Sequence, residues 1–99
     1  MDSRKLALID STAYKMNALM KEIIRATIDQ TVTPLELMSM IQKHRTQTEL
    51  FSNLLDSVPS SKMESVKKSV LETISASEIQ LSKEEKDFMI NNLPNGLFE

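Results

Sequence analysis

Few side chains in this chain could perform catalysis. It contains a single histidine, His44, and no cysteine. A hydrolytic site needs a nucleophile, a base and an orienting group close together, and one imidazole supplies little of that set. The sequence has neither an HExxH zinc motif nor an EF-hand loop, and Gly96, its only glycine, cannot form a glycine-rich phosphate loop. We therefore expect a non-enzymatic protein with no catalytic residues, no cofactor and no metal site.

An acidic cluster late in the chain has a structural explanation. Glu84, Glu85 and Asp87 follow Ser82, and the spacing of Ser82 and Glu85 is that of a capping box. Carboxylates in the first turn of a helix are stabilised by the helix dipole. The pattern therefore favours the start of a helix over a metal site.

His44 falls on an otherwise largely apolar helical stripe. The members of this stripe recur every three or four residues and are Leu37, Ile41, His44, Thr48, Phe51 and Leu55. His44 could be an ordinary buried histidine with a satisfied hydrogen bond, or a polar core residue that fixes the register of an oligomer. It could also be a pH-sensitive contact, since imidazole titrates near a pH of about 6.5. A fourth alternative is a helix break within the polar segment 42–49.

Length and composition indicate the class of fold. The chain has 99 residues and a formal charge of −2, which suits a single domain spanning 1–99. An apolar fraction of 40% with balanced charge is typical of a globular protein. A single glycine leaves little material for the turns between strands. We therefore predict an all-α fold.

Capping signals divide the chain into predicted helices. Thr33, Pro34 and Glu36 combine an N-cap, an N1 proline and the glutamate of a capping box. Ser61 and Glu64 have the same capping-box spacing. The predicted helices cover about residues 3–31, 34–57, 61–77 and 83–92. A short link between the first two predicts a long antiparallel hairpin, with two shorter helices completing a bundle.

The first predicted helix carries an apolar stripe with the heptad spacing of a coiled coil. The first helix would be about 43 Å long and the second about 35 Å long. Two short helices cannot cover the whole length of such a hairpin. Exposed apolar surface costs about 25 cal/mol per Å², so we expect a homo-oligomer, a dimer. The alternative is that shorter or kinked helices close on themselves as a monomer. The residues expected to carry self-association or partner binding are Leu6, Ile9, Met16, Leu19, Met20, Ile23, Met38 and Ile41.

These features favour a protein–protein interaction module of a bacterial or phage accessory type. Methionine is unbranched and adapts to irregular surfaces, which suits variable partners, and methionines are frequent in the first two predicted helices. We expect a small regulator, inhibitor, adaptor or secretion-type chaperone that binds another protein. Apolar runs are too short to span a membrane, so a cytoplasmic location is expected.

The alternative function is nucleic-acid association by a regulatory protein. Phosphate binding requires a basic surface, and the first two predicted helices carry several cations. These cations are Arg4, Lys5, Lys15, Lys21, Arg25, Lys43 and Arg45. Acidic residues are interleaved with those of the first helix, a pattern more typical of a solvated helix face.

Overall fold

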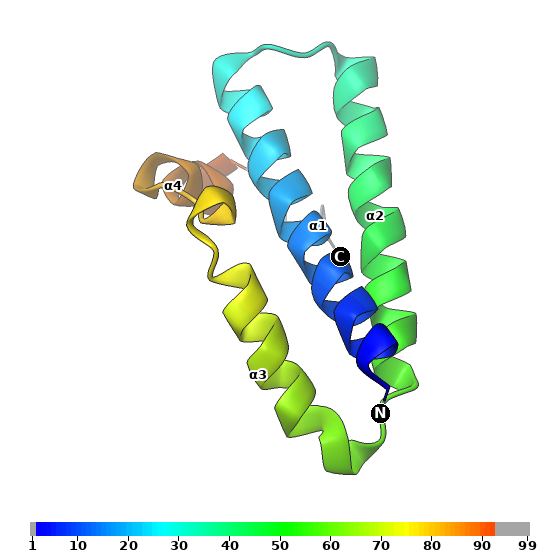
Figure 1. The fold of residues 1–99 in the computed structure, drawn as a ribbon. Coiled ribbons are helices and arrows are strands. Elements are labelled where there is room, and N and C mark those ends of the chain that lie inside the picture. The colour runs from blue at the N-terminus through cyan, green and yellow to red at the C-terminus, as the bar shows by residue number, and fades with distance from the viewer. Residues whose placement is uncertain (1, 93–99) are drawn as a thin grey trace.

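The computed structural model describes residues 2–92; residues 1 and 93–99 lie outside that range. Its elements are α1 (Ser3–Asp29), α2 (Pro34–Asp56), η1 (Ser60–Lys62), α3 (Met63–Ile74), η2 (Ser77–Ile79) and α4 (Lys83–Asn92) (Figure 1). The two η elements are short 3₁₀ turns. No strand occurs among residues 2–92, and the predicted all-α fold is confirmed.

Two of the three predicted capping boxes form. At the start of α2, the Thr33 N–H donates to Glu36 Oε1 at 2.9 Å, and the Glu36 N–H donates to Thr33 Oγ1 at 3.2 Å. At the start of α4, the Ser82 N–H donates to Glu85 Oε1 at 2.8 Å, and the Glu85 N–H donates to Ser82 Oγ at 3.1 Å. Each box satisfies backbone donors that a helix start leaves without an intrahelical partner.

The third predicted capping box, at Ser61 and Glu64, is absent from this segment. Pro59 holds an extended backbone, and the Lys62 N–H donates to its carbonyl at 2.9 Å. That hydrogen bond closes a 3₁₀ turn over Ser60–Lys62, which includes the serine that would cap the helix. α3 therefore begins at Met63, without a side-chain cap, and not at residue 61.

Two helices end two or three residues earlier than predicted, and α2 ends one residue earlier, at Asp56. α1 ends at Asp29 and not at residue 31, because Gln30 adopts a left-handed conformation with φ of 54°. α3 ends at Ile74 and not at residue 77. Ser75 Oγ donates to the Glu72 carbonyl at 2.7 Å, which satisfies one of the acceptors left at the helix end.

α1 is the central element. It packs against α2, α3, α4 and η2, whereas no comparable contact within residues 2–92 joins α2 to α3 or to α4. Figure 1 shows α2 and α3 on opposite sides of α1, with α4 beside its C-terminal half. The molecule measures 43 × 25 × 21 Å. α2 and α3 therefore each have a flank without a helical neighbour in the described part of the chain.

Apolar side chains are buried toward both ends of α1. At its N-terminal end, Ile9 packs with Val58 and Val66, surrounded by half-buried side chains of α2 and α3. At its C-terminal end, Ile24 is fully buried, and Ile79 of η2 is buried as well. The second group lies where ion pairs also hold α4.

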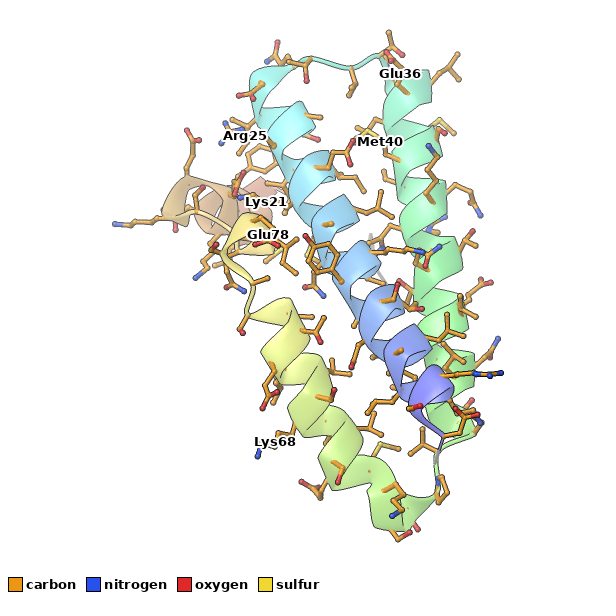
Figure 2. All side chains as sticks on the ribbon, in the orientation of Figure 1. Lys21, Arg25, Glu36, Met40, Lys68 and Glu78 are labelled. Atoms are coloured by element: carbon orange, nitrogen blue, oxygen red, sulfur yellow. The ribbon has the colours of Figure 1, made fainter. Side chains whose placement is uncertain are left out.

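These ion pairs attach α4 to α1. Glu85 is 1% exposed, and its carboxylate accepts a hydrogen bond from Lys21 Nζ at 2.7 Å. A nitrogen of Arg25 lies 3.6 Å from the other Glu85 oxygen and 2.9 Å from a Glu84 oxygen. Lys21 Nζ also donates to the Gln80 carbonyl at 2.8 Å. Figure 2 shows Lys21 and Arg25 on the side of α1 that faces this segment.

The Glu85 carboxyl is held in its charged form. Burial alone would raise its pKa, but hydrogen bonds from Lys21 and Ser82 outweigh that effect and lower the pKa below its usual value of 4.5. Because the folded pKa is below the unfolded one, the ionised carboxylate stabilises the fold above the unfolded pKa. That contribution is lost as the pH falls through the folded pKa.

Glu85→Gln should lower the free energy of unfolding at pH 7 by about 2 kcal/mol, because a buried charge-assisted hydrogen bond is lost. The variant should also lose less stability than the wild type as the pH falls below about 4.5. Urea unfolding followed by circular dichroism measures both effects. The control is Glu84→Gln at an exposed position, which should cost less than about 0.5 kcal/mol. Equal losses for the two variants would contradict the assigned role.

Candidate functional site

The surface of residues 2–92 carries exposed apolar side chains and hollows between the helices. Among residues 2–92, no group of three His, Asp or Glu side chains is arranged to hold a metal ion. None of the helices in that range combines the length and apolarity needed to cross a bilayer. The features that remain are the exposed apolar side chains and the hollows between helices.

The predicted association stripe of α1 is only partly available. Ile9 and Ile23 are buried inside the single chain, so in this structure they belong to its core and have no surface to offer a partner. Their burial follows from the packing of α2 and α3 on two sides of α1. The remaining members on this helix are half-buried and are Leu6, Met16, Leu19 and Met20.

α2 is much less buried than α1. Six residues of α1 are buried, whereas His44 is the single buried residue among the 23 of α2. Met38, a predicted binding residue, is 64% exposed, and Ile41 is half-buried. Leu35, at 79% exposure, was not among the predicted binding residues. It lies inside the capping-box sequence Thr33–Glu36, whose spacing predicts a helix start and says nothing about exposure.

His44 is 2% exposed and faces the interior. The predicted alternative of a helix break is wrong, because α2 is continuous through 42–49. Within that polar stretch, Thr46 Oγ1 donates to the Gln42 carbonyl at 3.0 Å, and Thr48 Oγ1 donates to the His44 carbonyl at 2.9 Å. Burial lowers the pKa of the imidazole below 6.5, which favours the neutral form.

A hollow of about 330 Å³ lies between α2 and α3. Its walls are apolar and include Phe51 and Leu55 of α2 with Met63, Val66 and Val70 of α3. We call it the α2–α3 hollow. It follows from the arrangement of the helices, since α2 and α3 both pack on α1 and are not closed against each other. The sequence does not predict this hollow, because it depends on the angle between two helices.

A larger hollow of about 590 Å³ lies between α1, the start of α2 and η2. Four of its charged and polar side chains are already paired, namely Tyr14, Lys21, Arg25 and Glu78. Tyr14 Oη donates to Glu78 Oε1 at 3.1 Å, and Lys21 and Arg25 are held by carboxylates of α4. Figure 2 shows Lys21, Arg25, Glu78 and Met40 around this region. The arrangement indicates a structural junction rather than a ligand site.

Comparisons of this chain with protein-family models, with curated proteins and with solved structures give no significant match. The structure places two features on that surface: the exposed apolar pair Leu35 and Met38 at the start of α2, and the α2–α3 hollow.

His44→Leu should keep or raise the stability at pH 7, because an apolar side chain replaces a buried imidazole. The folded pKa of His44 is lowered, so the unfolded wild type binds more protons and its stability falls as the pH drops below about 6.5. The variant should lose this component. Melting curves between pH 7 and pH 5 measure it, with the exposed neighbour Lys43→Leu as the control. The same pH dependence in both variants would contradict the prediction.

Proposed function

We propose that this protein is a non-enzymatic protein–protein interaction module that self-associates as a dimer. It binds another protein through apolar helix faces, as a small regulator, inhibitor, adaptor or secretion-type chaperone of the cytoplasm. In this proposal, α1 and α2 act together as a long antiparallel hairpin. The hairpin presents one flank of α2 to the partner.

The observation that carries the proposal is the weak burial of α2. This helix has 23 residues, of which only His44 is buried, and α1 is the one helix in residues 2–92 against which it packs extensively. A long helix held on one side leaves a flank that a second protein can cover. Covering apolar surface gains about 25 cal/mol per Å².

Leu35 and Met38 provide suitable anchors on that flank. They are 79% and 64% exposed and stand three residues apart, so they are neighbours on the helix surface. Anchors at spacings of three and four residues are the usual elements of helix recognition by a groove. Methionine adds an adaptable contact, which suits a partner of irregular shape.

The nucleic-acid alternative has less support from the contacts. Two of the cations on which it depends, Lys21 and Arg25, are engaged by carboxylates of α4. Lys15 and Lys43 do line one shared hollow between α1 and α2, together with Glu22. That small, partly neutralised group is a weak basis for phosphate binding, which requires a net basic surface.

The double variant Leu35→Glu with Met38→Glu should remain folded, because both side chains are exposed, and should bind its protein partner at least about tenfold more weakly. Quantitative pull-down from the source cell, read by mass spectrometry, compares the variant with the wild type. The matched control is Ser39→Glu, which places charge on a neighbouring exposed position. Capture of the same proteins at the same yield by all three forms would overturn the proposed binding face.

A further inference from the structure

The outer face of α3 combines a protruding apolar side chain with an apolar hollow. Leu71 is 63% exposed. It lines the α2–α3 hollow on one side and, on the other, a shallower hollow with Lys68 and Glu72. Leu71 is therefore a ridge between two depressions. A contact between identical surfaces requires a projection and a recess on the same patch, and this patch has both.

The charges on this face are also arranged for self-recognition. Lys67 and Lys68 precede Leu71, and Glu72 follows it. If two α3 helices crossed antiparallel with a centre near residues 69 and 70, the cations of each helix would face Glu72 of the other. A parallel crossing would place Lys67 and Lys68 against their own copies, which is unfavourable. The charge pattern therefore selects the antiparallel arrangement, which a two-fold axis produces.

Two of these charges are available for such a contact. Within residues 2–92, neither Lys68 nor Glu72 takes part in an ion pair, and Lys67 has a single long contact of 3.8 Å with Glu64. Figure 2 shows Lys68 pointing away from the body of the protein. Leu71 lines the α2–α3 hollow and is itself 63% exposed, so this part of the rim of the hollow is open to solvent in residues 2–92.

We propose that a second copy of this chain docks antiparallel on α3, so that Leu71 of each copy enters the α2–α3 hollow of the other. A hollow of about 330 Å³ with apolar walls has room for a leucine side chain. The face carries two cations and two anions, Glu64, Lys67, Lys68 and Glu72, so it matches itself better than a partner of one charge sign. This inference rests on the self-association in the proposed function and names its interface.

The first test is the oligomeric state of the full chain. Sedimentation equilibrium across micromolar concentrations should show a dimer for the wild type. Leu71→Glu should weaken dimerisation at least about 100-fold, because the substitution occurs at two symmetric places in the interface. Ile90→Glu, at an exposed position on α4, is the matched control and should leave the dimer unchanged. Circular dichroism checks that each variant keeps its helices.

A charge swap tests the antiparallel geometry. Lys68→Glu and Glu72→Lys should each weaken the dimer, because each places like charges opposite one another. The double variant carrying both substitutions should bind better than either single variant, since positions 68 and 72 of the two copies again carry opposite charges. A wild type that stays monomeric, a dimer that resists Leu71→Glu, or a double variant no better than the singles would overturn the proposal.

The outcomes separate this interface from the proposed partner-binding face. A dimer that is insensitive to Leu71→Glu but is lost when Leu35 and Met38 are changed would overturn the α3 interface and leave the interaction function standing. A dimer that depends on Leu71, together with partner capture that is unaffected by Leu35 and Met38, would support the α3 interface and overturn the partner-binding face.

Discussion

The fold depends on one constraint, which is that every other helix packs against α1. α2, α3 and α4 each contact this central helix and have no comparable contact with one another in residues 2–92. Several elements therefore cover the apolar stripe of α1, and its residues Ile9, Ile23 and Ile24 are buried within one chain. The same arrangement leaves the outer flanks of α2 and α3 uncovered. The exposed apolar side chains and the α2–α3 hollow result from the packing of α2 and α3 on α1 alone.

The helix starts that depend on local hydrogen bonds could be predicted from the sequence. Thr33 with Glu36, and Ser82 with Glu85, satisfy the backbone within a few residues, and both boxes form. The box predicted at Ser61 failed because Pro59 imposes a different turn just before it. Capping-box spacing therefore predicts a helix start only where the preceding residues do not impose another turn.

The candidate surface was harder to predict, because exposure depends on the relative placement of helices. Periodicity placed His44 correctly on the inner face of α2, since that position follows from one helix alone. Periodicity also assigned Ile23 to a partner, although the chain buries it by itself. The hollow beside Leu71 depends on the angle between α2 and α3. Neither the composition nor the residue spacing of the chain predicts that angle. Sequence patterns identified apolar faces, and the packing decided which of them stay open.

The one-sided support of α2 has a consequence for the dynamics of the molecule. Its C-terminal half contributes Phe51, Leu54 and Leu55 to the apolar core, whereas its N-terminal half carries the most exposed apolar residues. The free energy of local opening is smallest where few buried contacts hold an element in place. Amide protons in the first turns of α2 should accordingly exchange with solvent through partial opening, while those of α1 await global unfolding. We therefore expect the start of α2 to open more readily than α1, because fewer buried contacts hold it in place.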